Sequence, residues 1–143
     1  MCFLMGLAGT GKSTIIEVIA AMFSKRAIAE IDGNHEKVFG LHSKSDKELI
    51  LIRDAPKTLS IVLPQEHFQK MISGEAIQIS VKFKTAFASD WTVPMIGASN
   101  HPLDYNDNQG QISRRVVMFK FEKMLSAAGK KRWFVLYSGW EMF

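Results

Sequence analysis

The stretch GLAGTGKST, residues 6–14, decides the fold of this chain. Two of its glycines, then Lys12 and Ser13, satisfy the phosphate-loop pattern of glycine, any four residues, glycine, lysine and serine. The glycines let backbone N–H groups turn inward around a phosphate, and a helix beginning at Lys12 directs its positive end toward it. Lys12 would then reach the outer phosphates and Ser13 would bind Mg²⁺. The stretch therefore predicts a nucleotide site made of Gly6, Leu7, Ala8, Gly9, Thr10, Gly11, Lys12, Ser13 and Thr14.

The residues on both sides of this loop have the form that a phosphate loop requires. Before it, residues 2–5 are a short apolar run that predicts a buried strand entering the glycine loop. After it, residues 12–24 predict a helix with one apolar face toward a core, formed by Ile15, Ile16, Ile19, Met22 and Phe23. A chance match to the motif is the alternative, and both flanks argue against it.

Further along the chain, predicted strands alternate with helices. Strands are predicted at residues 27–31, 49–52, 76–84, 92–100 and 116–121. A helix is predicted at residues 64–72, with proline at its start and Gly74 just past its end. This alternation indicates an α/β fold with a parallel sheet flanked by helices.

Composition limits the class of protein. The 143 residues, 47% hydrophobic and 22% charged, are typical of one soluble globular domain. The formal charge of +4 suits an acidic partner such as a nucleotide or nucleic acid. Cys2 is the one cysteine, which excludes an internal disulfide, and no cysteine and histidine spacing indicates zinc, so we expect a reducing, intracellular location. No apolar stretch is long enough for a membrane span.

Asp54 is the candidate acid of a P-loop enzyme, since it follows the apolar run LILIR. An acid at the end of a neighbouring strand would hold Mg²⁺ and orient the attacking water. An ordinary turn aspartate is the alternative. Many motors carry two adjacent acids here, whereas this chain has Arg53, Asp54 and Ala55. A second acid must therefore come from elsewhere or be absent.

Asn100 stands at a similar position, after the apolar stretch PMIGAS. In open α/β sheets, ligands bind at the carboxyl ends of the strands. A side-chain amide there could hydrogen-bond both the terminal phosphate and the lytic water. The alternative is a turn-forming asparagine before His101 and Pro102, and spacing leaves both open.

The ordered motifs resemble those of superfamily 3 helicases, the AAA+-type hexameric replication motors of DNA viruses. They are the phosphate loop, the strand ending in Asp54, SGEAIQISVKFK, PMIGASN and GQISRRVVMFKF, and they span about Phe3 to Phe121. The chain is most similar to the helicase part of primase-helicase proteins of large DNA viruses. The resemblance implies a P-loop NTPase with an AAA+-like sheet, with Asp54 in the Walker B place and Asn100 in the sensor place.

The resemblance also implies an inserted β-hairpin that projects toward single-stranded DNA. Lys82 and Phe83 fall near its tip, with Lys84 beside them. Lysines pair with backbone phosphates, and an aromatic ring stacks on a sugar or base. The alternative is an exposed edge strand whose lysines discourage aggregation.

The paired arginines of QISRRVVMFKF gain a meaning from the same resemblance. In the family, an arginine finger at the subunit boundary precedes an aromatic strand. Arg115 lies four and six residues before Phe119 and Phe121, so we choose it over Arg114. Such a finger would stabilise charge on the phosphoryl group bound by the adjacent subunit.

Taken together, the motifs predict nucleotide binding, and the family resemblance implies an ATP-dependent DNA helicase motor that translocates on single-stranded DNA during viral DNA replication. Its catalytic residues would be Lys12, Asp54, Asn100 and Arg115, with ATP as substrate and Mg²⁺ held by Ser13 and Asp54. By resemblance, the partners are single-stranded DNA, copies of the chain in a homo-oligomeric, hexameric ring, and a primase domain in the full-length protein. No membrane is expected, and a viral protein would act in the host cytoplasm or nucleus.

Two alternatives remain. A small P-loop phosphotransferase, a nucleotide or metabolite kinase, could use Arg114 and Arg115 in a lid over its own phosphates. An incomplete motor would bind nucleotide without unwinding. We expect one domain, residues 1–143, with the motifs in 1–121 and a tail of uncertain role at 122–143. We also expect the chain to be a fragment of a longer protein.

Overall fold

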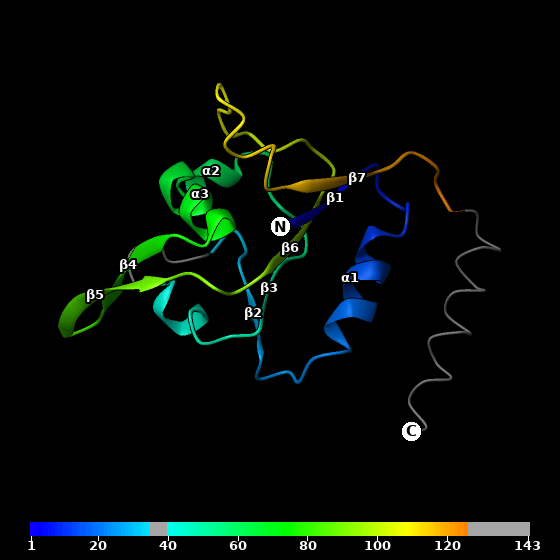
Figure 1. The fold of residues 1–143 in the computed structure, drawn as a ribbon. Coiled ribbons are helices and arrows are strands. Elements are labelled where there is room, and N and C mark those ends of the chain that lie inside the picture. The colour runs from blue at the N-terminus through cyan, green and yellow to red at the C-terminus, as the bar shows by residue number, and fades with distance from the viewer. Residues whose placement is uncertain (35–39, 126–143) are drawn as a thin grey trace.

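A computed structural model describes residues 1–34 and 40–125 of the chain, arranged around one five-stranded sheet (Figure 1). The strand order is β2-β3-β6-β1-β7, and every neighbouring pair is parallel. The strands are β1 (Cys2–Gly6), β2 (Ile28–Glu30), β3 (Leu49–Ile52), β6 (Met95–Ser99) and β7 (Val117–Phe121). The predicted α/β class with a parallel sheet is confirmed.

Four short helices and a separate hairpin complete the described residues. The helices are α1 (Lys12–Ala20), the 3₁₀ helix η1 (His42–Lys44), α2 (Leu59–Val62) and α3 (Gln65–Ser73). The hairpin pairs β4 (Ala76–Val81) with β5 (Lys84–Asp90) in antiparallel register. Among the described residues, every helix is too short or too polar to cross a membrane.

Strand β3 is buried on both faces, because helices cover each side of the sheet there. In β3, Ile50 and Ile52 pack in the cluster that includes α2 and α3, whereas Leu49 and Leu51 pack in the cluster that includes Ile16 of α1. Figure 1 shows α1 on one side of the sheet and α2 and α3 on the other. This two-sided burial explains why β3 is a continuous apolar run and not an alternating one.

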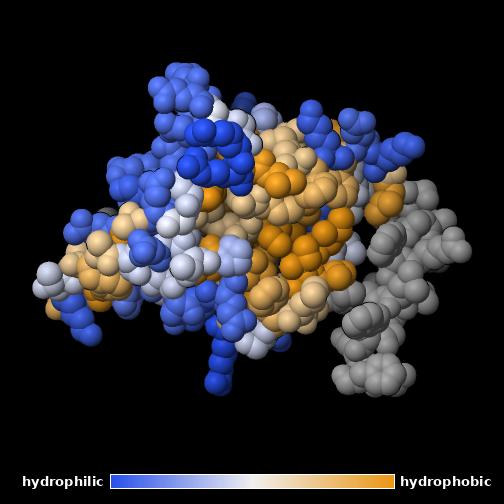
Figure 2. All heavy atoms as spheres, in the orientation of Figure 1, coloured by the Kyte–Doolittle hydropathy of each residue, from blue (hydrophilic) through white to orange (hydrophobic). Residues whose placement is uncertain are grey.

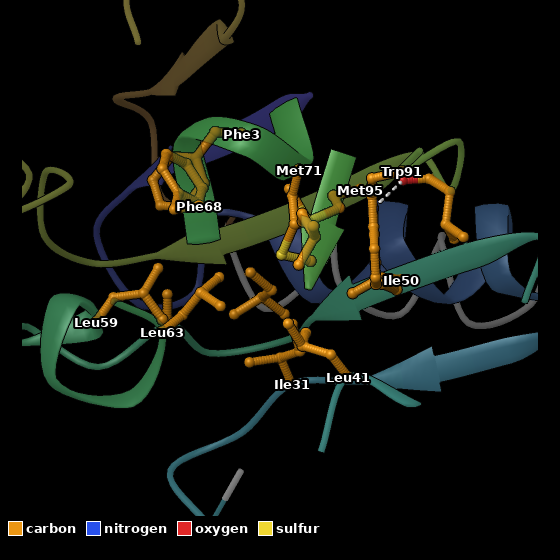
Figure 3. Packing of buried hydrophobic residues seen from close by; sticks show 14 of the residues in the cluster. Phe3, Ile31, Leu41, Ile50, Leu59, Leu63, Phe68, Met71, Trp91 and Met95 are labelled. Atoms are coloured by element: carbon orange, nitrogen blue, oxygen red, sulfur yellow. Dashed lines mark hydrogen bonds between the residues drawn. The ribbon is translucent and has the colours of Figure 1, made fainter. Parts of the chain in front are cut away.

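The larger cluster also anchors the hairpin (Figure 3). Ile77 and Ile79 of β4 are fully buried in it. Trp91, just after β5, is 3% exposed, and its indole N–H donates to the Val93 carbonyl oxygen at 3.0 Å. The root of the hairpin is therefore part of the core, and the linker that contains Trp91 leads into β6.

A glycine at the centre of the sheet makes room for an aromatic ring. A Cβ on Gly97 of β6 would lie 2.9 Å from the ring of Phe3 on β1, closer than real Cβ contacts come. Phe3 is fully buried, so its ring has little space to retreat. The close approach of β6 to β1 therefore depends on Gly97.

Most predicted elements are confirmed, and the differences have local causes. β3 has the predicted bounds, and α3 begins after Pro64 and ends at Gly74, which has a left-handed φ of 74°. α1, however, ends at Ala20, four residues before the predicted end. The sequence pattern did not predict α2 or η1, each of which spans a single turn.

The predicted apolar face of α1 is wrong for two residues. Ile16 and Ala20, four residues apart, face the sheet and are buried, whereas Ile15 is 37% exposed and Met22 is 77% exposed. Val18 is also exposed, and Figure 2 shows hydrophobic residues gathered over α1. The buried face of α1 is thus narrower than the spacing of its apolar residues predicts.

The predicted strand at 76–84 turns earlier than expected. β4 ends at Val81, the chain reverses at Lys82 and Phe83, and β5 returns from Lys84. The sequence KTAFASD of β5 mixes small and polar residues and carries a weak strand signal. The hairpin implied by the family resemblance is nevertheless present.

Candidate functional site

The residues of the phosphate loop connect β1 to α1 at the carboxyl edge of the sheet. They border an open pocket of about 360 Å³. Residues 8–14 form one wall, and Arg53, Asp54, Asn100 and Leu125 line the remainder. The structure thus gathers the predicted nucleotide-site residues 8–14 and three predicted catalytic residues, Lys12, Asp54 and Asn100, around one pocket.

Lys12 is the most enclosed charged group of this pocket, with 8% of its surface exposed. Its Nζ donates hydrogen bonds to the carbonyl oxygens of Gly6 at 2.7 Å and Leu7 at 2.8 Å. It also donates to Asn100 Oδ1 at 3.0 Å. Burial lowers the pKa of the Lys12 ammonium from its ordinary value, and the charge of Asp54 partly offsets this. The ammonium is therefore held at the centre of the loop by oxygens that a phosphate could replace.

Glycine is required in the loop for two different reasons. Gly9 and Gly11 have φ values of 78° and 92°, a left-handed region that other residues rarely adopt. A Cβ on Gly6 would lie 2.2 Å from the backbone oxygen of Phe121 on β7. The first glycine of the motif is thus fixed by strand packing as well as by any ligand.

The strand order explains why Asn100 meets Lys12. β6 lies between β1 and β3, so the residue after β6 emerges between the phosphate loop and the Asp54 loop. Residue 100 is 88 positions from Lys12 in the sequence, and the parallel sheet brings the two side chains into contact.

A buried serine, which the sequence analysis did not single out, connects the loops that carry Asp54 and Asn100. The Ser99 hydroxyl donates to the Ala55 carbonyl oxygen at 2.9 Å, and the Ala55 N–H donates to the Ala98 carbonyl oxygen at 2.7 Å. Ser99 is 3% exposed. Its one signal in the sequence is a polar residue at the end of a predicted strand.

The residues proposed to hold Mg²⁺ fit that ion. Ser13 and Asp54 line the same pocket. Among the described residues, no group of three or more histidine, cysteine, aspartate or glutamate side chains could hold a metal. Mg²⁺ bound with a nucleotide commonly takes one or two carboxylates, and phosphate oxygens and waters complete its shell. One carboxylate and one hydroxyl beside a phosphate loop suit this chemistry.

Arg53 is a pocket residue whose contacts the sequence did not reveal. Its Nε donates to Glu30 Oε1 at 2.7 Å, and one Nη atom contacts a carboxylate oxygen of Glu17. The hydrogen bond to Glu30 raises the pKa of the guanidinium. Three separate elements meet at this side chain, because Glu17 belongs to α1, Glu30 to β2, and Arg53 follows β3.

Leu125 is a second pocket residue missed by the sequence analysis. Its N–H donates to the Gly9 carbonyl oxygen at 3.0 Å, so the segment after β7 contacts the phosphate loop. A hydrophobic residue beyond the last motif does not by itself indicate a contact with the phosphate loop. Residues 126–143 of the predicted tail lie outside the described residues.

The paired arginines lie at the opposite edge of the sheet from the pocket. Arg115 precedes β7, and its carbonyl oxygen accepts a hydrogen bond from the Met1 ammonium at 2.9 Å. Its Nη1 donates to the Gln111 carbonyl oxygen, and Arg114 Nε donates to that of Gly110. The five residues of β1, at about 3.3 Å per residue, separate this edge from the phosphate loop. Neither arginine lines the pocket of its own chain.

The tip of the hairpin carries the three residues predicted to contact DNA. Lys82 and Phe83 form the turn, and Lys84 is the first residue of β5. Phe83 is fully exposed (101%) and has a φ of 60°, the one positive value among the described non-glycine residues. An exposed aromatic ring on a left-handed residue is costly, and such strain is common at functional sites.

Solved structures with a similar fold include a helicase, at low sequence identity. A crystal structure of JCV helicase bound to a substituted acetamide matches 96% of this chain and 40% of that chain, with a TM-score of 0.62 and 14% identity. An apo structure of the NrS-1 C terminal region matches 96% of this chain and 34% of that chain, with a TM-score of 0.65 and 16% identity. This chain thus spans well under half the length of these proteins, and the likeness shows a shared fold.

The sequence comparisons identify a family. No curated protein matches the sequence of this chain. Residues 4–115, which include the phosphate loop, Asp54, Asn100, the hairpin and both arginines, match the model of a family described as DUF5906, a family of unknown function. Because this match covers most of the chain, the protein belongs to the DUF5906 family.

Proposed function

We propose that this chain is the ATPase part of a helicase motor that hydrolyses ATP and moves along single-stranded DNA. The observation that carries the proposal is the hydrogen bond between Lys12 Nζ and Asn100 Oδ1, in a pocket also lined by Asp54. A phosphate-binding lysine, a strand-end acid and a polar amide are the groups that ATP hydrolysis needs. Their convergence from three neighbouring strands supports an ATPase over a chance match to the loop.

Each residue has a distinct role in the proposed reaction. Backbone N–H groups of residues 8–14 and the Lys12 ammonium bind the phosphates of ATP. Ser13 and Asp54 would hold Mg²⁺, which would supply charge neutralisation for the bound phosphates. Asn100 hydrogen-bonds the terminal phosphate and the attacking water. Because Asn100 already contacts Lys12, loss of that phosphate would change the environment of the residue that directly follows β6.

The position of Arg115 favours an assembly of several subunits. It lies at the edge of the sheet opposite the pocket of its own chain, so it is suited to reach the pocket of an adjacent copy. We propose that it acts there as an arginine finger in a homo-oligomeric ring, with the AAA+-like arrangement that the superfamily 3 resemblance implies. The fold likeness to JCV helicase is consistent with this role.

The hairpin is the proposed DNA-binding element. Lys82 and Lys84 would pair with backbone phosphates, and Phe83 would stack on a sugar or base. β6 joins the two functions directly, since the hairpin linker enters it and Asn100 follows it. A change at the terminal phosphate could therefore move the hairpin. Viral DNA replication and a linked primase domain remain part of this proposal through the family resemblance.

A P-loop phosphotransferase is the second candidate function. It explains the pocket, but its lid would need Arg114 and Arg115 near the phosphates of the same chain, whereas they lie at the far edge. It also gives no role to the fully exposed Phe83. An incomplete motor that binds nucleotide without turnover is the third.

The test is the ATPase rate measured against protein concentration, with and without single-stranded DNA. A motor should show a rate per chain that rises with concentration and with DNA. A rate that ignores both, but rises with a small-molecule phosphate acceptor, would favour the phosphotransferase. ATP binding without turnover would favour the incomplete motor.

A further inference from the structure

Arg53 is a cation in the candidate nucleotide pocket, at a place where many P-loop motors have an acid. It directly precedes Asp54 and lines the pocket with Lys12, Ser13 and Asn100. Its side chain is 37% exposed, so a ligand in the pocket could reach it. A positive charge at this position favours anionic ligands in the pocket.

Two carboxylates hold the Arg53 guanidinium. Glu30 accepts a hydrogen bond from its Nε at 2.7 Å, and Glu17 contacts one of its Nη atoms. A guanidinium has five N–H donors in one plane, so two carboxylates leave donors available for a third acceptor. Glu17 and Glu30 do not line the pocket, whereas Arg53 does. The carboxylates therefore restrict the side chain of a pocket-lining residue that retains unused hydrogen-bond donors.

Stability is a weak explanation for this cluster. The Glu17 and Glu30 side chains are 52% and 49% exposed, and ion pairs at such exposure contribute little to the free energy of unfolding. The planar, bidentate guanidinium is well suited to phosphate recognition, and holding it in place lowers the entropy lost on binding.

We propose that Arg53 binds the terminal phosphate of a nucleoside triphosphate, and that Glu17 and Glu30 hold its guanidinium ready for that contact. This inference rests on the proposed function, because it assigns a residue to the same nucleotide site. It makes Arg53 the residue that distinguishes a triphosphate from a diphosphate. Asp54 then supplies the metal-binding charge, and its neighbour supplies a phosphate-binding one.

The experiment measures ATP and ADP affinities with Mg²⁺ for the whole chain and its variants. Arg53→Ala should weaken ATP binding about tenfold or more and ADP binding less than about twofold, since a charge-assisted contact to the terminal phosphate is lost. Arg26→Ala is the matched control, because Arg26 is an exposed arginine of the described residues that does not line the pocket. It should leave both affinities unchanged.

Two further variants separate recognition from folding. Arg53→Lys keeps the charge but cannot span two carboxylates, so it should retain part of the ATP preference. Glu30→Gln removes the negative charge of one anchor without changing a residue that lines the pocket, and should lower the preference by a smaller factor. Thermal unfolding of each variant shows whether it is folded.

The outcomes are distinguishable. An equal loss of ATP and ADP affinity in Arg53→Ala, or an unchanged ratio, would overturn this inference and leave the proposed function standing. If the wild-type chain bound neither nucleotide, both would fall. A selective loss of ATP affinity in Arg53→Ala, with a normal Arg26→Ala control, would support the inference.

Discussion

The two edges of the sheet differ in how they present their functional residues. At the carboxyl edge, Lys12 is 8% exposed and is held by backbone and side-chain oxygens. At the amino edge, Arg115 precedes β7, and the linker after the hairpin leads into β6. At the tip of the hairpin, the Phe83 side chain is fully exposed to solvent. The carboxyl edge encloses its lysine, whereas the hairpin leaves an aromatic ring open to solvent.

Strand β6 connects these two edges directly. β6 ends at Ser99, directly before Asn100, and begins at Met95, directly after the hairpin linker. β6 is five residues long and mostly buried, so we expect displacement at one end to be passed to the other. Variants can test whether the pocket at the carboxyl edge is active by itself or needs the amino edge and the hairpin.

The largest effect is expected from Arg115→Ala. If Arg115 at the amino edge of one subunit completes the nucleotide pocket at the carboxyl edge of the next, its loss should lower ATPase turnover about 10³-fold or more. ATP binding should remain. Mixing Arg115→Ala chains with Lys12→Ala chains should restore some activity, because mixed neighbours can form an intact site. Turnover assays of the mixture decide the point, and no recovery at any ratio would mean that the two edges do not cooperate.

Lys12→Ala should have the next largest effect. Lost charge-assisted hydrogen bonds of about 3 kcal/mol correspond to roughly 100-fold weaker ATP binding. Equilibrium binding with a fluorescent ATP analogue measures this. Lys70→Ala is the control, since Lys70 pairs with Glu66 on the surface of α3. Equal ATP affinity for wild type and Lys12→Ala would argue against the pocket as the nucleotide site.

Phe83→Gly should separate function from stability at the hairpin. Loss of an aromatic contact of about 1–3 kcal/mol predicts roughly tenfold weaker binding of single-stranded DNA. Glycine adopts positive φ without strain, so the same change should raise the free energy of unfolding by about 1 kcal/mol.

The control for the hairpin is Phe87→Ala. Phe87 lies in β5, is 44% exposed and packs edge-on against His42, so its loss should lower stability and spare DNA affinity. The readouts are fluorescence anisotropy with labelled DNA and thermal unfolding. Normal DNA affinity in Phe83→Gly would remove the tip from the proposed interface.

The smallest expected effect is a pH dependence of stability and of ATP affinity that arises from Lys12 at the carboxyl edge. Because burial lowers the pKa of Lys12, the folded protein binds fewer protons than the unfolded chain just below the ordinary lysine pKa of about 10.4. The Lys12 contribution to stability therefore rises with pH across that window. Phosphates favour the charged form, so ATP affinity should fall severalfold over the same window. Lys12→Ala should lose both trends, and identical profiles for wild type and variant would contradict the assignment.

The sequence predicted the sheet better than its surroundings. β3 was predicted with its bounds because a strand buried on both faces reads as a continuous apolar run. β5 was missed because its residues are mostly exposed, and α1 was predicted too long because Met22 continued the apolar spacing past Ala20. Exposure on the surface does not follow from spacing alone.

The residues of the candidate site also fall into two groups, those that local motifs predict and those that only the tertiary structure reveals. The phosphate loop, Asp54 and Asn100 follow from local motifs, and the structure places them around one pocket. The contacts of Arg53 join residues from three elements, and Ser99 acts through the backbone of a neighbouring loop. Such contacts depend on the tertiary arrangement, so the local sequence carries no trace of them. The catalytic and DNA-binding roles stay predictions.

The glycine at the centre of the sheet has an evolutionary consequence. Since a side chain at position 97 would collide with the ring of Phe3, the two positions share one fixed volume. Among relatives, residues larger than glycine at position 97 should therefore occur with residues smaller than phenylalanine at position 3. Variation at these two sites should be correlated, even though neither side chain touches the pocket.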